Sequence, residues 1–144
     1  MVCKEFEKTK MEGEKGFAVI LTNPLKQTTV RMQKSSKNQV DGYSVCWDYH
    51  VVFVLKSSEG AFVYDHDSRL QWGVPFKEYY DQALATKPGE LKTVYRIVPA
   101  NLFLKNFASD RSHMIQIVNG KKKYTQQPPS YPAITNEEGQ IMTL

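Results

Sequence analysis

The sequence contains few cysteines and no long apolar run, and each absence excludes a class of protein. Cys3 and Cys46 are its two cysteines, too few for the disulfide framework of a small secreted domain, so reduced thiols are expected. No apolar run approaches the roughly 18 to 20 residues that span a bilayer. The amino-terminal residues are charged from Lys4 onward and lack the apolar stretch of a secretory signal. A membrane partner is therefore not expected.

Motifs for metals, phosphates and nucleic acids are also missing. The three histidines and two cysteines show no metal-ligand spacing, and there is no glycine-rich phosphate loop, so neither a metal nor another cofactor is expected. The formal net charge of +4 is mild, and the lysines are scattered apart from Lys121–Lys123. These lysines and the aromatic content leave an RNA-binding domain as an alternative, but no aromatic–glycine motif of that kind is present.

What the sequence does contain is typical of a single α+β domain, residues 1–144, with an antiparallel sheet and helices packed on it. It is 41% hydrophobic and 24% charged over 144 residues, which suits a globular chain with a buried core. Residues 33–44 are polar and predict a surface loop. Strands are predicted over 17–21, 45–55, 61–65 and 93–98. Apolar residues at helical spacing predict three helices: 2–11 (Val2, Phe6 and Met11 inward), from Pro75 to 84 (Phe76, Tyr79, Tyr80, Ala83 and Leu84), and 99–108 (Leu102, Phe103 and Phe107 inward).

The predicted hairpin places a histidine beside a carboxylate. In an antiparallel ladder the numbers of opposed residues add up to a constant, and side chains alternate between faces. A four-residue loop over 56–59 gives a sum of 115, which sets His50 opposite Asp65. A two-residue loop at Ser58-Glu59 gives 117, which makes the pair diagonal neighbours on one face. Such a pair suits a general base and its orienting carboxylate, although many such pairs are only structural.

Other polar residues are weaker candidates. Asp48 shares the face of His50, and Asp67 would approach it in another register. His66 alternates to the face opposite Asp65, where an exposed or structural role is expected. His113 follows Asp110 and Arg111 in a polar segment, and a hydrogen-bonded structural role is favoured there.

A nucleophile for this base is not evident. Cys46 lies four strand residues from His50, about 13 Å away at roughly 3.3 Å per residue, far beyond hydrogen-bond reach. It is predicted to be a small buried hydrophobic residue. Cys3 lies on the predicted first helix, and the sequence does not fix its distance to His50.

Several stretches of the sequence resemble a known family. Trp47-Asp-Tyr-His-Val-Val52, followed by Tyr64-Asp65-His66-Asp67, resembles the core of the protein N-terminal glutamine amidohydrolases. Leu104-Lys-Asn-Phe-Ala-Ser-Asp-Arg-Ser-His-Met114 resembles a second family segment, and Pro128-Pro129-Ser130-Tyr131-Pro132 a proline-rich stretch that follows it. The likeness covers most of residues 1–135.

The resemblance implies a papain- or transglutaminase-like fold and a Cys-His-Asp triad, with His50 as its histidine and Asp65 as its aspartate. It implies deamidation of an N-terminal glutamine of protein substrates to glutamate, with release of ammonia, in the arginine N-degron pathway. It further implies a monomer, without cofactor or nucleic acid, in the cytoplasm and also the nucleus. The residues that bind the substrate remain unknown; Asp110 and the segment Trp47–Tyr49 are candidates for the pocket, with a structural role favoured for Asp110.

The sequence departs from the family pattern at the nucleophile. The family cysteine lies at the start of the first helix, in a Cys-Tyr-Cys-Glu-Glu-Asn-like segment, whereas Val2-Cys3-Lys4-Glu5-Phe6 matches later turns of that helix. Cys3 therefore corresponds to a non-catalytic position. The family cysteine is expected before Met1, and the chain is expected to be a form shortened at both ends, with an incomplete first helix and little or no activity. The alternative is a non-catalytic module that binds N-terminal peptides or acts as a scaffold.

Overall fold

The structure is a computed structural model that describes residues 2–108 and 115–124. The chain divides into two compact units, Met1–Asn101 and Leu102–Leu144. The assignment of residues 1–144 to a single domain stays a prediction. Among the described residues, no helix is long and apolar enough to cross a membrane.

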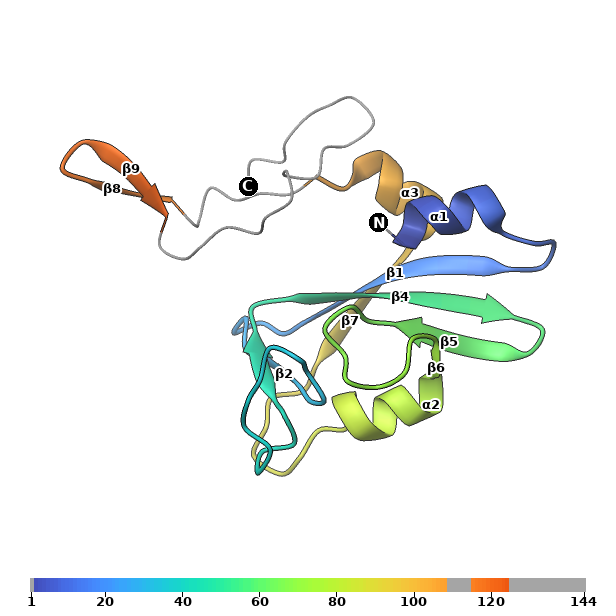
Figure 1. Ribbon diagram of the computed structural model, residues 1–144, viewed down its shortest axis with the longest axis horizontal. Helices are drawn as coiled ribbons and strands as arrows, with labels where there is room; N and C mark the ends of the chain where they lie inside the picture. The colour runs from blue at the N-terminus through green and yellow to red at the C-terminus, as the bar shows by residue number, and fades with distance from the viewer. Residues whose placement is uncertain (1, 109–114, 125–144) are drawn as a thin grey trace. The chain divides into compact units, whose positions relative to one another are not determined.

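A five-stranded antiparallel sheet forms the centre of the first unit (Figure 1). This confirms the predicted α+β class with an antiparallel sheet. The strand order is β6-β5-β4-β1-β7. The bounds are Lys15–Thr22 for β1, His50–Ser57 for β4, Gly60–Tyr64 for β5, Val74–Pro75 for β6 and Val94–Pro99 for β7. The apolar run at 17–21 is thus a strand, as predicted, and it lies between β4 and β7.

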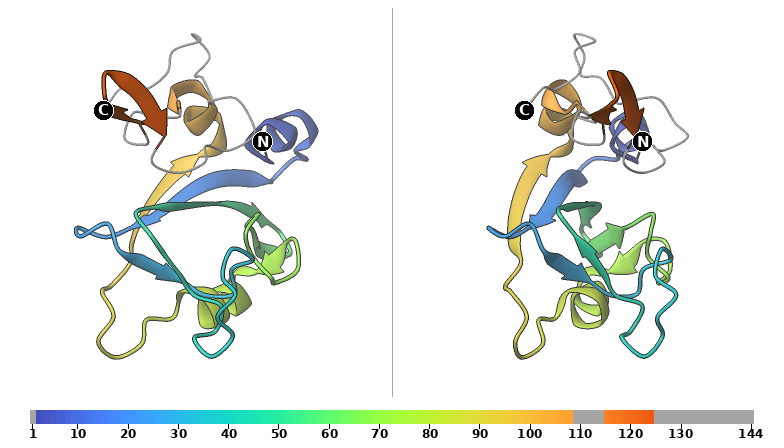
Figure 2. Two further views of the ribbon diagram at one scale, coloured as in Figure 1. Left: turned by 60° about the vertical axis from the view of Figure 1, so that its left-hand side comes forward. Right: turned by 90° about the vertical axis from the view of Figure 1, so that its left-hand side faces the viewer.

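Helices cover the two faces of this sheet (Figure 2). On one face lie α2 (Phe76–Tyr79) and the π-helical turn η1 (Tyr80–Leu84) that continues it. Side chains alternate along a strand, so every second strand residue points to this face. Together with residues of α2 and η1 these side chains form the main core: Val19, Leu21, Val30, Val52, Val63, Val74, Tyr79, Ala83 and Leu84. Phe76 and Tyr80, predicted on the same side of the helix, are instead exposed and stack on each other.

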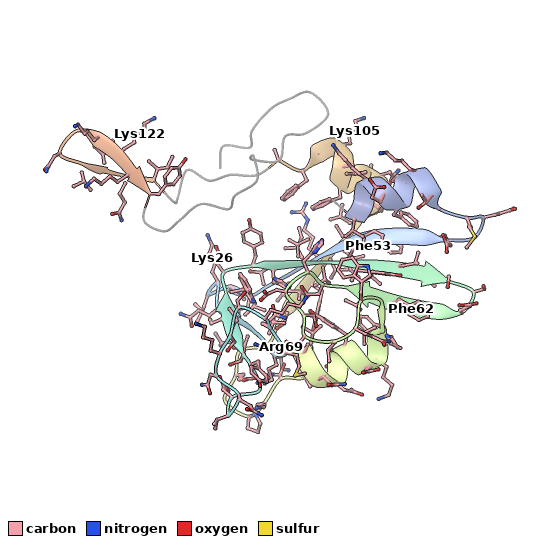
Figure 3. The ribbon with its side chains drawn as sticks, viewed as in Figure 1. Lys26, Phe53, Phe62, Arg69, Lys105 and Lys122 are labelled. Atoms are coloured by element: carbon pink, nitrogen blue, oxygen red, sulfur yellow. The ribbon has the colours of Figure 1, made fainter. Side chains whose placement is uncertain are left out.

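The other face carries α1 (Val2–Thr9), whose buried residues are Cys3 and Phe6. Phe6 packs against Phe53 of β4, with ring centroids 5.4 Å apart, and Figure 3 shows Phe53 on the side of the sheet toward α1. Gly16 permits this approach, because a Cβ there would lie 2.5 Å from Phe6 Cε1. The predicted inward position of Met11 is wrong: the helix ends at Thr9, and Met11 is 70% exposed.

The predicted strand 45–55 is two strands. β3 (Val45–Trp47) pairs with β2 (Thr28–Val30) in a separate two-stranded sheet, while β4 begins at His50. The break falls at Asp48, whose carboxylate Oδ1 accepts the Tyr49 N–H over 2.8 Å and whose carbonyl accepts the Thr22 hydroxyl over 2.9 Å. Such local bonds compete with the ladder, so the chain turns there.

The β4–β5 hairpin takes the second of the two predicted registers. Ser57 pairs with Gly60 and Phe53 with Tyr64, so the numbers of opposed residues add up to 117. The connecting turn is the two-residue loop Ser58-Glu59. This register makes His50 and Asp65 diagonal neighbours on one face of the sheet.

In the second unit, β8 (Ile115–Val118) pairs with β9 (Lys121–Tyr124). Their turn, Asn119-Gly120, has positive φ at both residues, and this dipeptide is typical of two-residue hairpin turns. The predicted helix over 99–108 is α3 (Ala100–Asn106). Phe103 of this helix stacks on Phe107, which directly follows it, with ring centroids 4.4 Å apart. Leu102 is 48% exposed rather than inward. The candidates Asp110, Arg111 and His113 and the proline-rich stretch 128–132 lie outside the described residues.

Candidate active site

His50 and Asp65 meet at the end of the β4–β5 hairpin. His50 is the first residue of β4 and Asp65 directly follows β5. Nε2 of His50 lies 2.9 Å from Oδ1 of Asp65. The side chains are 10% and 1% exposed, respectively, so the pair is shielded from water. The diagonal arrangement of residues 50 and 65 in this register therefore brings their side chains within hydrogen-bond distance.

Four donors surround the Asp65 carboxylate. Oδ1 accepts from His50 and from the backbone N–H of Asp67 at 3.0 Å. Oδ2 accepts from Nε2 of Gln33 at 3.1 Å and from the hydroxyl of Tyr79 at 2.8 Å. A carboxylate has about four lone-pair sites, so this one is saturated.

These donors decide the charge of Asp65. Burial raises the pKa of this carboxyl, but the hydrogen bonds from His50, Gln33 and Tyr79 and the attraction of His50 outweigh it and hold the pKa at about 2. Burial and the negative charge of Asp65 together raise the pKa of Tyr79 far above its ordinary value, so its hydroxyl stays protonated and acts as a donor. Asp65 is ionised at neutral pH.

An ionised Asp65 fixes the tautomer of a neutral His50. A carboxylate accepts hydrogen bonds only, so the nitrogen facing it, Nε2, carries the proton. The lone pair then lies on Nδ1. Nδ1 has no hydrogen-bond partner among the described residues. It is also absent from the buried polar atoms that lack a partner, so it is open to solvent. A pair in this arrangement can act as a general base with its orienting carboxylate.

The interruption between β3 and β4 places the ring of Trp47 on that of His50. The indole of Trp47 stacks on the imidazole, with centroids 4.9 Å apart and planes inclined by 25°. Because β3 ends at Trp47 and β4 begins at His50, the turn between the two strands brings these rings together. The sequence motif contained both residues, but a single continuous strand gave no reason to expect the stack.

Gln33 and Tyr79 were missed as site residues. Tyr79 was predicted among the apolar residues of a helix, but the hydrogen bond from its hydroxyl to Asp65 was not predicted. Gln33 was placed in a surface loop, yet it is fully buried. Nothing in a lone glutamine among polar residues distinguishes it, because its burial depends on pairing across the fold: Arg69 Nε donates to the Gln33 carbonyl.

The other acidic and histidine candidates have separate roles. Asp48 is exposed and bonds to the Tyr49 N–H rather than to His50. Asp67 accepts from the hydroxyl and the N–H of Ser35. His66 is exposed, as expected, with its ring 4.8 Å from that of Trp72. Within the part of the chain that the structure describes, no group of three or more His, Cys, Asp or Glu residues is placed to hold a metal.

Neither cysteine makes a hydrogen bond with His50 in the described residues. Cys3 lies on the buried side of α1, on the sheet face opposite His50, and burial raises the pKa of its thiol to about 11. The prediction that Cys46 is buried is wrong: it is exposed. It belongs to the short two-stranded sheet rather than to the central one, and alternation turns it away from the side on which Trp47 contacts His50.

Comparison with known proteins gives the family of the chain. The N-terminal glutamine amidase family matches the chain over residues 1–144. The chain belongs to this family. Similar members of the N-terminal glutamine amidases include proteins called protein N-terminal glutamine amidohydrolase in Caenorhabditis briggsae, Bos taurus and Homo sapiens.

The Caenorhabditis briggsae protein is 37% identical over 143 residues, which cover 94% of this chain and 72% of the relative. The Bos taurus protein is 35% identical over 132 residues, covering 89% of this chain and 61% of the relative. The Homo sapiens protein is 33% identical over 132 residues, covering 89% and 62%. The chain thus spans between 61% and 72% of the length of these N-terminal glutamine amidases.

Proposed function

We propose that this protein is a protein N-terminal glutamine amidohydrolase in which His50 is the general base and Asp65 orients it. The observation that carries the proposal is the buried pair Nε2–Oδ1 at 2.9 Å, which leaves Nδ1 as a base. The names of the relatives supply the substrate, an N-terminal glutamine of a protein. The reaction is acyl transfer from nitrogen to oxygen.

The proposed mechanism proceeds through a thiolate. Nδ1 of His50 takes the thiol proton, and the sulfur attacks the side-chain carboxamide carbon of the terminal glutamine. The imidazolium, stabilised by Asp65, protonates the leaving nitrogen, which departs as ammonia and leaves a thioester. Water then loses a proton to the same imidazole, attacks the thioester carbon and releases glutamate and the thiol. Backbone N–H groups near the sulfur would stabilise the oxyanion.

We further propose that the thiol in this mechanism is neither Cys3 nor Cys46. Cys3 lies on the far face of the sheet with its pKa raised to about 11, so little thiolate forms near neutral pH. Cys46 is exposed and faces away from His50. The resemblance assigns the role to a cysteine at the start of the helix of which α1 is a later part. The 144 residues by themselves would then show little turnover.

A second candidate function follows from the same observation. Without a thiol beside His50, the chain would act as a non-catalytic module that binds N-terminal peptides or serves as a scaffold. For the catalytic form, the family also implies a monomer with a papain- or transglutaminase-like fold in the cytoplasm and nucleus. Its glutamate product would receive an arginine in the N-degron pathway.

An ammonia-release assay separates these functions. The substrate is a peptide that begins with glutamine, and the controls are an Asn-initiated peptide and a sample without protein, since terminal glutamine also cyclises with loss of ammonia. The 144-residue chain is expected to match its His50→Gln variant. Joining a Cys-Tyr-Cys-Glu-Glu-Asn helix start ahead of Val2 should restore turnover that His50→Gln abolishes.

Three other outcomes would change the assignment. Turnover by the 144-residue chain that Cys3→Ala abolishes would make Cys3 the nucleophile. Turnover that survives both Cys3→Ala and Cys46→Ala would exclude the thiol mechanism. An extended chain that binds the Gln-initiated peptide without releasing ammonia would favour the binding module.

A further inference from the structure

Two buried side chains share one oxygen of the Asp65 carboxylate. Gln33 Nε2 and the Tyr79 hydroxyl both donate to Oδ2, at 3.1 Å and 2.8 Å. Gln33 and Tyr79 are each 0% exposed. They come from distant parts of the chain, the loop after β2 and the end of α2, so their meeting is a product of the tertiary fold.

The amide of Gln33 is held in the orientation that donates. Its Nε2 group also lies 3.3 Å from the carbonyl of Arg31, so both of its neighbours are acceptors. Rotating the amide by half a turn would set Oε1 against those two oxygens, which is repulsive. The cost of the observed orientation is that Oε1 is buried without a hydrogen-bond partner among the described residues. A buried orphan acceptor is destabilising, and here it accompanies a donor aimed at Asp65.

The Tyr79 hydroxyl is restricted in the same way. Burial and the nearby Asp65 charge keep its proton in place, and the ring is part of the main core. The two donors on Oδ2 therefore fix the rotation of the carboxylate about its Cβ–Cγ bond. That rotation sets where Oδ1 points, and Oδ1 is the atom that meets Nε2 of His50.

We propose that Gln33 and Tyr79 are positioning residues that keep Asp65 ionised and its Oδ1 directed at His50, so that the imidazole retains its proton on Nε2 and presents Nδ1 as the base. This inference rests on the proposed function for its consequence in catalysis. The positioning itself is a property of the folded chain and is measurable without turnover. Neither residue touches the reacting atoms.

Carboxyl-carbon NMR titration of Asp65 tests the proposal in the 144-residue protein. Tyr79→Phe removes one donor and keeps the ring, and Gln33→Glu replaces the other donor with a carboxyl group of the same shape. Each variant should raise the Asp65 titration midpoint from about 2 by about 1 to 2 pH units, because a carboxylate loses a hydrogen bond or gains a like charge. Tyr64→Phe, on the opposite face of β5, and the exposed Gln71→Glu are the matched controls and should leave the midpoint unchanged.

Imidazole nitrogen shifts of His50 provide the second readout. The wild-type neutral ring should be a single Nε2–H tautomer, and both variants should show a mixture with the Nδ1–H form. Unchanged Asp65 midpoints and an unchanged tautomer in both folded variants would overturn the proposal. In an extended chain with turnover, the same variants should lower kcat about 10-fold or more with KM little changed. An extended chain whose variants show the NMR changes but which has no turnover would contradict the proposed function and leave the positioning role intact.

Discussion

The indole ring of Trp47 lies on the imidazole of His50, with the ring centroids 4.9 Å apart and the planes inclined by 25°. A hydrogen bond to Asp65 holds one edge of the imidazole, and the indole covers one of its flat sides. Together the two contacts limit both the in-plane and the out-of-plane rotation of the ring. The proposed role of His50 as a base requires this restraint, because a misplacement of about 1 Å can cost about 100-fold in rate.

The first prediction concerns this stack. Trp47→Ala should lower the free energy of unfolding by about 2 to 3 kcal/mol, less than for a fully buried tryptophan because Trp47 is half-buried. Trp47→Phe should cost about 1 kcal/mol, since a flat ring remains. Urea denaturation near neutral pH measures both. Trp72→Ala is the matched control: Trp72 also contacts a histidine ring, His66 at 4.8 Å, but it is 54% exposed and its loss should cost about 1 kcal/mol or less. Equal losses at the two positions would contradict the role assigned to Trp47.

The pairing of His50 with Asp65 could be predicted from the sequence because it depends only on local rules. Side chains alternate along strands, and a short turn fixes the register. A four-residue loop and a two-residue loop both give odd sums of opposed residue numbers, so both keep the pair on one face. The actual turn, Ser58-Glu59, selected the diagonal arrangement.

The remainder of the site could not be predicted, because it depends on contacts between distant segments. Gln33 is polar and lies in a polar stretch, and contacts with distant residues, among them Asp65 and Arg69, accompany its burial. The separation of Trp47 from β4 reflects the pairing of β3 with β2, which no periodicity in residues 45–55 indicates. The exposure of Cys46 follows from the same pairing.

A second prediction separates the two thiols. With excess alkylating reagent at neutral pH, the folded protein should show one fast-reacting thiol, Cys46, which is exposed. Cys3 should react slowly, at a rate limited by opening of the fold, because its thiol is buried and burial raises its pKa to about 11. Mass spectrometry of quenched samples measures the two rates. Cys46→Ser should remove the fast phase, and a fast phase that persists in this variant would contradict the burial of Cys3.

A third prediction concerns the buried Arg31. Its guanidinium donates to the Ala85 carbonyl at 2.9 Å and pairs with Glu90, and the backbone of Arg31 donates to the Ala83 carbonyl. Arg31→Met should lower the free energy of unfolding by about 2 to 3 kcal/mol, since the part-buried Ala85 carbonyl and the Glu90 carboxylate lose the donor that the buried guanidinium supplies. Denaturation curves at fixed pH measure the loss. Lys77→Met removes the exposed pair with Asp81 and should change stability by about 0.5 kcal/mol or less. A loss for Arg31→Met no larger than this control would exclude a structural role for the ion pair between Arg31 and Glu90.

Acid should destabilise the fold through Asp65. The pKa of this carboxyl falls from its ordinary 3.8 to about 2 in the folded protein, so the folded state binds the proton more weakly than the unfolded state. The resulting stabilisation, about 2 kcal/mol, is fully present above about pH 4 and is lost as the pH falls toward 2. Asp65→Asn should be less stable at about pH 5 but should lack this part of the acid loss. Urea unfolding free energies between about pH 5 and pH 2.5 test the sign, since the two curves should converge as the pH falls. Parallel curves would show that the folded and unfolded states bind this proton equally. That result would contradict the lowered pKa of Asp65 and the effect assigned to its four donors.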